Sequence, residues 1–204
     1  MTAALLHGAA RANPRRPRVR RRPRSTGLTL VVLGAVVGGA MGVPGALLAG
    51  GDGVAALDAL EAAYTFHFLN LVRWERPSPV LSFCVLGDSD AGERMQSALR
   101  DKTVHGQRIQ TRRVGSDGAG DEPCDAVYIS GAARGGSLPA LLKRYEGSAT
   151  LTISDAPEFA QGGGVIGFVV IEDRLRFDIN EGIASRKGLK ISAKLLELAR
   201  RIVR

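Results

Sequence analysis

The stretch Thr150–Asn180, TLTISDAPEFAQGGGVIGFVVIEDRLRFDIN, decides the fold expected for this chain. It contains two β-prone runs, Val165–Ile171 and Leu175–Ile179, on either side of the short polar segment Glu172–Arg174. Two such runs around a polar turn predict a β-hairpin. Side chains alternate between the two faces of a strand, so the second run is predicted to be half buried. Its apolar face holds Leu175, Phe177 and Ile179, and its polar face holds Arg176, Asp178 and Asn180.

Three consecutive glycines, Gly162–Gly164, precede the predicted hairpin. Glycine can adopt positive φ or let another segment approach closely. The cluster completes no G-x-G-x-x-G and leads into a strand, so dinucleotide binding is not expected. Asp155, Asp178 and Glu181 could gather near the glycines, although turn and cap roles are favoured over paired catalytic carboxylates. A small-molecule pocket at this turn stays open as an alternative.

Upstream of this stretch, apolar strands alternate with helical patterns. This alternation predicts a single α/β domain, with a mainly parallel sheet flanked by helices and a C-terminal β-hairpin at one side. The strands expected before the hairpin cover residues 80–86, 108–114, 126–130 and 150–153, and the second of these is polar enough to be an edge strand. The helices expected before the hairpin cover residues 54–72, a segment that ends at about 99 and is capped by Ser89 or Asp90, and residues 138–145. After the hairpin, helices are expected over 183–186 and 191–203, the last capped by Ser192.

The net charge of +8 comes from the first 27 residues, which form a basic segment expected to be disordered. Eight arginines precede residue 25 and no acidic residue precedes Asp52, while the other 20 basic residues match the 20 acidic ones. A nucleic-acid-binding domain would carry the basic excess on its folded part, so nucleic acid is not an expected partner.

The basic segment is followed by Leu28–Gly50, 23 residues without a charge. This order is typical of an export signal or a membrane anchor, and the run is just long enough to span a bilayer. Small residues around Ala56 favour a cleaved signal over an uncleaved anchor. Both interpretations place the domain over 56–204 outside the cytoplasmic membrane, since the arginines stay inside.

The only cysteines are Cys84 and Cys124, each in or beside a strand-like run. An even number of cysteines in an exported domain favours a disulfide, and two buried free thiols are the alternative.

Few catalytic patterns are present. Gly87-Asp88-Ser89 after an apolar strand resembles the nucleophile block of GDS-type hydrolases, which require a histidine base late in the chain. The histidines are His7, His67 and His105, so a helix cap is the favoured role of Ser89. Two cysteines and two widely separated domain histidines do not predict a zinc site. No catalytic residue, metal or cofactor is therefore expected.

Several motifs in order resemble the YfiR family. They are A-x-Y-x-F-x-F-x-x-x-V-x-W over 62–74, F-C-V-L-G over 83–87, C-D-x-V-Y-I-S over 124–130, F-A-x-x-G-G over 159–164, L-R-F-x-I-N over 175–180 and L-x-I-S-x-x-L-L-x-L-A over 189–199. The motif positions singled out by this resemblance are Phe66, Trp74, Gly87, Gly162, Gly163, Phe177 and Asn180. The resemblance covers most of the chain, from about residue 56 to its end.

The resemblance implies a periplasmic, dimeric protein that binds the periplasmic sensor domain of an inner-membrane diguanylate cyclase and holds it inactive. This sequence departs from the pattern of the YfiR family at two places. This sequence keeps the Cys84 and Cys124 positions but lacks the second cysteine pair of the family, and the family's Trp-Pro turn is Trp74-Glu-Arg-Pro77 here. The favoured function is therefore an exported inhibitor of a cyclase, with a role in biofilm signalling. A periplasmic small-molecule-binding module is the alternative.

Overall fold

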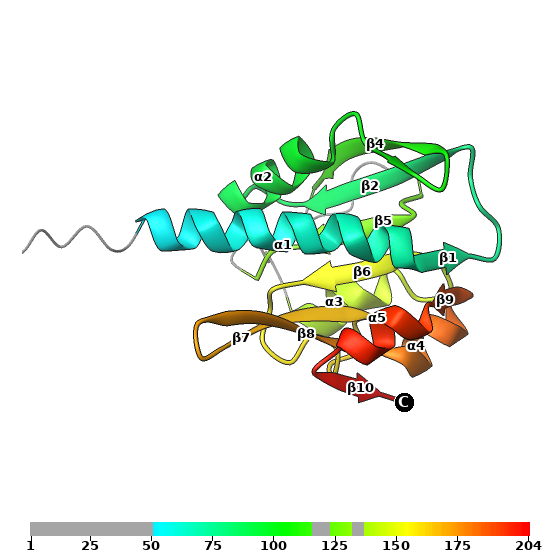
Figure 1. Cartoon of the computed structure of the whole chain (residues 1–204). Coiled ribbons are helices and arrows are strands. Elements are labelled where there is room, and N and C mark those ends of the chain that lie inside the picture. The colour runs from blue at the N-terminus through cyan, green and yellow to red at the C-terminus, as the bar shows by residue number, and fades with distance from the viewer. Residues whose placement is uncertain (1–50, 116–122, 132–136) are drawn as a thin grey trace, which may run out of the picture. The chain divides into compact units, whose positions relative to one another are not determined.

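The computed structural model describes residues 51–115, 123–131 and 137–204 of the chain (Figure 1). The expected basic segment and the apolar run Leu28–Gly50 lie outside the described residues, so their proposed roles stay predictions. None of the helices within the described ranges is long and apolar enough to cross a membrane.

Within these ranges, eight strands form one sheet in the order β10-β8-β7-β6-β5-β2-β4-β3. The strands from β4 to β7 run parallel to one another, and β8 returns antiparallel to β7. A separate antiparallel pair joins β1 to β9. The mainly parallel α/β sheet and the hairpin are thus confirmed. The strand bounds are β1 Val72–Trp74, β2 Val80–Leu86, β3 Thr103–Val104, β4 Gln107–Val114, β5 Ala126–Ile129, β6 Leu151–Ser154, β7 Ile166–Ile171, β8 Arg174–Asn180, β9 Leu189–Ile191 and β10 Arg201–Val203.

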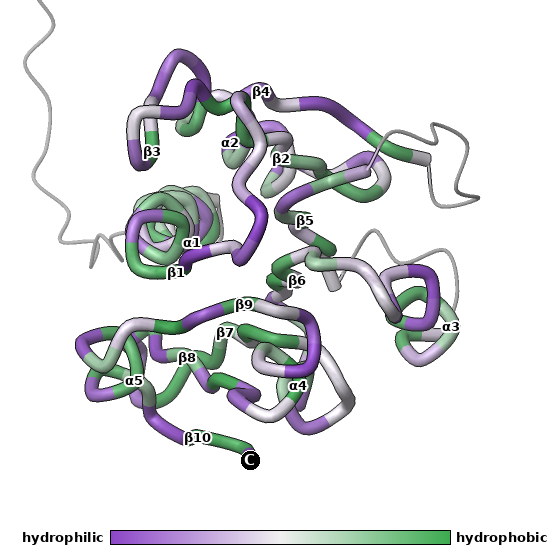
Figure 2. The backbone as a smooth tube through the Cα atoms, turned by 90° about the vertical axis from the view of Figure 1, so that its right-hand side faces the viewer, coloured by the Kyte–Doolittle hydropathy of each residue, from purple (hydrophilic) through white to green (hydrophobic). Residues whose placement is uncertain are grey.

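Helices cover both faces of the sheet. Figure 2 shows α1 and α2 on one side of it and α3 on the other, with α4 and α5 near the β8–β10 end. Strand alternation divides the core accordingly, because Phe83 and Val85 of β2 pack with α1 and α2, whereas Cys84 and Leu86 pack with α3. The helix bounds are α1 Gly51–Leu71, α2 Asp90–Leu99, α3 Leu138–Lys143, α4 Glu181–Arg186 and α5 Ala193–Leu198.

The hairpin turn is a tight, two-residue connection. Glu172 and Asp173 have φ of 49° and 56°, and the flanking pair is Ile171 opposite Arg174. Positive φ at both central residues matches the right-handed twist of the two strands. The prediction that the polar face of β8 is open to solvent is wrong for its second half, because Asp178 and Asn180 are only 1% and 7% exposed.

The long last helix predicted over 191–203 is also wrong. Ser192 does cap a helix, since its Oγ accepts a hydrogen bond from the Leu195 N–H at 3.2 Å. That helix, α5, ends at Leu198. The Arg200 N–H then donates to the carbonyl of Phe177 at 2.9 Å, and the chain continues as β10 alongside β8. The free edge of β8 offers backbone hydrogen bonds that outweigh the helical preference of this segment.

The predicted edge strand is partly covered. The two-residue β3 pairs with Gln107 and Arg108 at the start of β4, and it forms the last strand on that side of the sheet. The remaining length of β4 has no further strand outside it among the described residues, which agrees with its polar composition.

Candidate functional site

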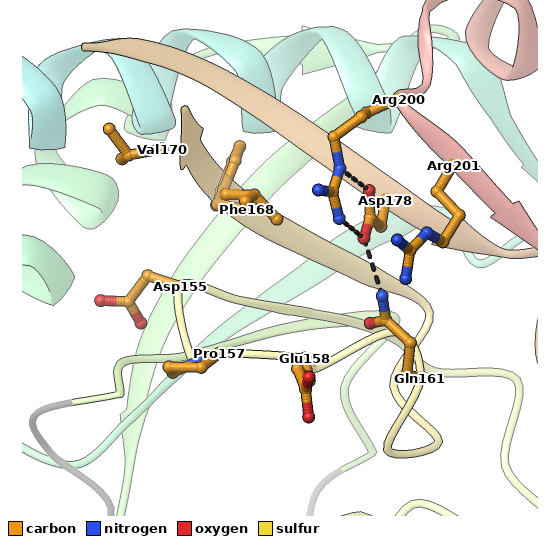
Figure 3. A pocket seen from close by; sticks show the side chains of 10 residues that line it. Asp155, Pro157, Glu158, Gln161, Phe168, Val170, Asp178, Arg200 and Arg201 are labelled. Atoms are coloured by element: carbon orange, nitrogen blue, oxygen red, sulfur yellow. Dashed lines mark hydrogen bonds and ion pairs between the residues drawn. The ribbon is translucent and has the colours of Figure 1, made fainter. Parts of the chain in front are cut away.

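A pocket of about 420 Å³ lies beside the glycine-rich turn, between the segment after β6 and strands β7, β8 and β10 (Figure 3). Two acidic residues, Asp155 and Glu158, line it on the side of the segment after β6, and Arg200 and Arg201 line the opposite side. The other lining residues are Pro157, Gln161, Phe168, Val169, Val170 and Asp178. The pocket therefore presents both signs of charge beside an apolar wall.

Asp178 forms the buried base of this pocket. Its carboxylate accepts hydrogen bonds from Arg200 Nε at 2.7 Å and Arg200 Nη2 at 2.5 Å, and from Gln161 Nε2 at 2.9 Å. Burial by itself would raise the pKa of Asp178, but these hydrogen bonds outweigh it and hold the pKa below its usual value. The carboxylate stays ionised and holds the hairpin to the chain that follows α5.

The three carboxylates expected near the glycines are separated in the structure. Asp155 and Asp178 both line the pocket, whereas Glu181 is directed to Arg204, whose Nε lies 3.4 Å from its Oε2. Asp155 accepts a hydrogen bond from the Gly131 N–H at 2.5 Å, which links the segment after β6 to the end of β5. All three carboxylates thus have a backbone or arginine partner, which suits structural roles in turns and in the pocket wall.

The three glycines differ in how strictly their positions require glycine. Gly163 has φ of +101°, a conformation that other residues rarely adopt. A Cβ on Gly164 would lie 2.0 Å from the Phe159 ring, so no side chain fits there. A Cβ on Gly162 would meet no atom closer than 3.4 Å. The glycine cluster was predictable, but the strict need for Gly164 follows only from the position of Phe159.

Trp74 anchors a second pocket of about 410 Å³ at the end of β1. Its Nε1–H donates to the carbonyl of Asp125 at 3.1 Å, across 51 residues of sequence. The Asp125 carboxylate in turn accepts the N–H of Ser82 at 2.7 Å and the hydroxyl of Ser78 at 3.4 Å. The altered turn after Trp74 is therefore attached to the start of β5 by polar contacts. The pocket is lined by Arg73, Trp74, Pro77, Ser78, Pro79, His105 and Gln107.

The remaining motif positions lie in the core or at turns. Phe177 is buried, with its ring centroid 4.8 Å from that of Phe68. Phe66 is half buried beneath the ammonium of Lys102, 4.6 Å from the ring centroid. Gly87 has φ of 74° at the end of β2.

Asn180 connects the glycine segment to α4. Its Oδ1 accepts the Ile183 N–H at 2.8 Å, which caps α4, and its Nδ2 donates to the Ala160 carbonyl at 2.7 Å. These two bonds explain why this polar residue at the end of β8 is buried.

The predicted disulfide between Cys84 and Cys124 is present, with a Cα–Cα distance of 5.9 Å. It connects β2 to the residue pair before β5, under the helix α3. Arg112 of β4 donates to Cys124 Sγ at 3.4 Å, so a cation lies beside one of the two sulfurs.

Ser89 acts as a helix cap, since its Oγ accepts the Gly92 N–H at 3.0 Å at the start of α2. No group of three or more His, Cys, Asp or Glu side chains that could hold a metal ion is found among the residues that the structure describes. His67 is exposed on α1, and His105 Nε2 lies 3.1 Å from the Val72 carbonyl.

One buried polar pair was missed by the sequence reasoning. Glu61 of α1 is 4% exposed and accepts a hydrogen bond from the hydroxyl of the fully buried Tyr128 on β5, at 2.9 Å. Burial raises the pKa of Glu61 to about 7, and the nearby carboxylates of Asp155 and Asp58 add to the rise against the opposing effect of the Tyr128 hydrogen bond. The available signal was a carboxylate on the inward face of an apolar helix, four residues after Leu57.

The fold and these pockets define a single-domain α/β protein with a pocket of charged and apolar side chains beside a C-terminal hairpin. A family model described as YfiR/HmsC-like matches residues 58–200, more than two thirds of the chain. The chain therefore belongs to the YfiR/HmsC-like family. This is a family of regulatory, periplasmic proteins, rather than one defined by a catalytic activity.

No curated protein matches the chain. Among solved structures, the ABC domain from Streptococcus pneumonia in complex with L-Trp is similar to it, with 14% sequence identity and a TM-score of 0.45. The match covers 61% of this chain and 55% of that one, so the chain spans about half the length of that protein. A likeness at this TM-score carries no argument about function.

Proposed function

We propose that this protein is an exported inhibitor that binds the periplasmic sensor domain of a membrane diguanylate cyclase. The observation that carries the proposal is the family match over 58–200, which includes nearly all of the folded domain. The inhibitor binds the inactive conformation of the cyclase better than the active one. The bound population then shifts toward the inactive state by the difference between the two binding free energies.

The charge and the surface of the domain support this function. The basic excess lies in the first 27 residues, so the domain is near neutral, as suits a protein partner better than a nucleic acid. Histidine, cysteine and serine nucleophiles are absent from the lining of the pocket at Asp178, which contains only carboxylates, arginines, one amide and apolar groups. That inventory suits binding.

Deletion of the gene tests the proposal. Cellular cyclic-di-GMP should rise in the deletion strain, because the inactive state of the cyclase loses its ligand. The rise should vanish when the partner cyclase is deleted as well. Unchanged cyclic-di-GMP in the deletion, under resting and oxidising conditions alike, would eliminate the inhibitor function.

A point variant sharpens the test. Gly163→Val should mimic the deletion, since valine is strained at φ of +101° and would displace the turn that leads into β7. Gly162→Ala is the matched control, because a Cβ there meets no atom closer than 3.4 Å. Exported levels of both variants must equal that of the wild type, so that loss of protein is not mistaken for loss of inhibition.

The second candidate function is small-molecule binding in the pocket at Asp178. The observation that favours it is the placement of carboxylates and arginines on opposite sides of one open pocket, beside Phe168 and Val170. Arg201→Ala should then abolish ligand-induced thermal stabilisation in a screen of zwitterionic metabolites, while Val80→Ala, distant from the pocket lining, should not. A screen without any stabilising compound would argue against this function.

A further inference from the structure

The first part of α1, residues 57–63, turns polar groups toward the sheet. Its buried side chains are Asp58, Glu61 and Ala62, and Leu57 is only partly buried against the core. The inward side of a surface helix is normally apolar, because burial of apolar area holds such a helix in place. Two carboxylates and a small alanine take that position here, so polar contacts hold the first part of α1.

The second part of α1 is anchored by apolar packing instead. Phe68 and Leu69 are buried, and the Phe68 ring lies 4.8 Å from Phe177 and 5.6 Å from Phe168, centroid to centroid. Thr65 lies between the two parts, and its buried Oγ1 has no hydrogen-bond partner within the described ranges. A buried hydroxyl without a partner costs free energy, which water would relieve if the first part of the helix left the sheet. The helix is therefore weakest at the boundary between its two parts.

Two side-chain contacts connect the first part of α1 to the rest of the domain. Asp58 Oδ2 accepts a hydrogen bond from Arg94 Nε of α2 at 2.9 Å. Glu61 Oε2 accepts one from the Tyr128 hydroxyl of β5, also at 2.9 Å. Asp58 and Asp155, the latter in the segment after β6, both act on Glu61 with like charge. Three carboxylates therefore share this interface when Glu61 is ionised.

The protonation of Glu61 decides how favourable this interface is. Burial raises the pKa of Glu61 to about 7, the Tyr128 hydrogen bond opposes the rise, and Asp155 and Asp58 add to it. Tyr128 stays neutral, because burial and the charge of Glu61 raise its pKa. A protonated Glu61 keeps its hydrogen bond without a buried charge. An ionised Glu61 is a buried charge whose hydrogen-bond donor is neutral, which is a costly arrangement.

The charged groups of the other elements beside α1 are engaged elsewhere. Arg94 of α2 is bound to Asp58, and Asp178 of β8 is bound to Arg200. Lys194 of α5 lines a groove beside the second part of α1. The groups that act on the Glu61 carboxyl are thus the tyrosine and the two aspartates already named.

We propose that the first part of α1 is a pH-sensitive arm, which docks on the sheet while Glu61 carries a proton and leaves the sheet when Glu61 is ionised. Within the described ranges α1 is the first element, so the arm can move without displacing another one (Figure 1). Asp58 and Glu61 both follow Ala56, so cleavage of a signal there would keep both carboxylates. Release uncovers Tyr128, and the surrounding pH then decides which surface the domain presents. This inference does not require a cyclase as the partner, so it and the proposed function can fail separately.

The direction of the pH effect follows from the protons that the two forms bind. Below about pH 4.5, Glu61 is protonated in the docked and in the released arm, so pH has no effect on release. Between pH 4.5 and 7 the released arm binds fewer protons, and release becomes more favourable by up to about tenfold per pH unit. Above pH 7 the effect is complete. From pH 5 to pH 8 the equilibrium constant for release should rise by up to about 70-fold.

Hydrogen exchange of the exported protein, with its disulfide intact, tests the arm. NMR follows each amide from pH 5 to pH 8, and each rate is divided by the intrinsic exchange rate at that pH. Amides 62–65 report release, because their helical acceptors lie at 58–61. Their opening should increase by up to about 70-fold in the wild type and stay nearly constant in Glu61→Gln. Amides 68–71 of α1 and 126–129 of β5 should show no such increase. His67, exposed on α1, is present in both proteins, so their comparison cancels its titration.

The other outcomes of this experiment would overturn the arm. Opening of amides 62–65 that does not change with pH would remove the pH response. An equal increase in Glu61→Gln would assign the response to another group. An equal increase in β5 would mean that the whole domain opens, without a separate arm.

Two further measurements keep the inference open to refutation if Glu61→Gln folds poorly. In the wild type with carbon-13 in its glutamate carboxyl groups, one glutamate should titrate near pH 7, and ordinary titration of every glutamate would overturn the inference. Thr65→Val, which removes the unbonded hydroxyl, should reduce the opening of amides 62–65 at every pH and leave its pH dependence unchanged. Loss of the pH dependence in Thr65→Val would contradict the role of Glu61.

Discussion

Replacing Glu61 with glutamine should make the stability of the domain less sensitive to pH. Glu61 lies between α1 and the sheet, 4% exposed, with the Tyr128 hydroxyl donating to it at 2.9 Å. Its pKa in the folded state is about 7, against 4.5 for an ordinary glutamate. The folded protein therefore holds a proton on Glu61 that the unfolded chain has already released, and ionisation destabilises the fold.

The sign and the size of the effect on the free energy of unfolding follow from this difference in pKa. Because the folded pKa is raised, the destabilisation is absent below about pH 4.5, grows through the window to pH 7 and is complete above it. At about 1.4 kcal/mol per pKa unit, the full effect is about 3 kcal/mol. Water entry and small rearrangements around the carboxylate make this an upper bound. Glutamine keeps an oxygen for the Tyr128 hydroxyl and removes the charge.

Chemical denaturation followed by circular dichroism, with the disulfide intact, measures the effect. The free energy of unfolding of Glu61→Gln should equal that of the wild type at pH 4.5 and exceed it by up to about 3 kcal/mol at pH 8. The difference between the two proteins cancels the titration of every other group. Glu197→Gln on the exposed side of α5 is the matched control and should show no such trend. A difference that stays constant from pH 4.5 to pH 8 would refute the reasoning.

Three further predictions concern other contacts of the domain. Formation of the Cys84–Cys124 disulfide should lower the intact mass by about 2 Da. Reduction of this disulfide, which closes a loop of 40 residues, should lower the free energy of unfolding by about 4 kcal/mol, less any strain. Two freely alkylated thiols in the native protein would contradict the disulfide. Gly164→Ala should lower the unfolding temperature, since its Cβ would lie 2.0 Å from the Phe159 ring, while Gly162→Ala should be tolerated; equal effects would be inconsistent with this geometry. Asp178→Asn should lower the free energy of unfolding by about 2 kcal/mol at pH 7, because Arg200 loses its carboxylate partner. This loss should become smaller below pH 4, where the wild type itself loses the stability that comes from the depressed pKa of Asp178. A loss that does not change with pH would speak against the ion pair.

Local pattern was enough to predict most elements of the sheet. The continuous apolar run of β2 and the alternation of the β7–β8 hairpin depend on which residues follow one another, and both predictions are confirmed. The cysteine pair could be assigned because only Cys84 and Cys124 are available. The last helix could not be bounded in this way, because helical spacing continues past Leu198 while the hydrogen bond from Arg200 to Phe177 spans 23 residues of sequence.

Predicting the candidate site required contacts between residues far apart in the sequence, more so than predicting the sheet did. The glycine-rich turn marked the region, but the pocket forms only when Arg200 and Arg201 return beside β8. The burial of Asp178 needed a cation 22 residues later in the chain, and the burial of Glu61 needed a hydroxyl 67 residues later. A buried charge is tolerated only with such a partner, and single-sequence reasoning cannot locate it.

The sequence by itself indicated six strands of the main sheet, β2 and β4 to β8, together with the hairpin, the favoured disulfide pairing and the family resemblance, because short-range periodicity, turn residues and ordered motifs carry that information. Only the tertiary structure decided which polar groups are buried and which apolar groups remain exposed. Asp58 and Glu61 turn inward on α1 while Leu60 faces solvent, because Arg94 and Tyr128 satisfy the two carboxylates from other elements. The exposed face of α1, which has no charged side chain between Gly53 and Leu71, follows from that inversion, and the pattern of α1 alone does not reveal it.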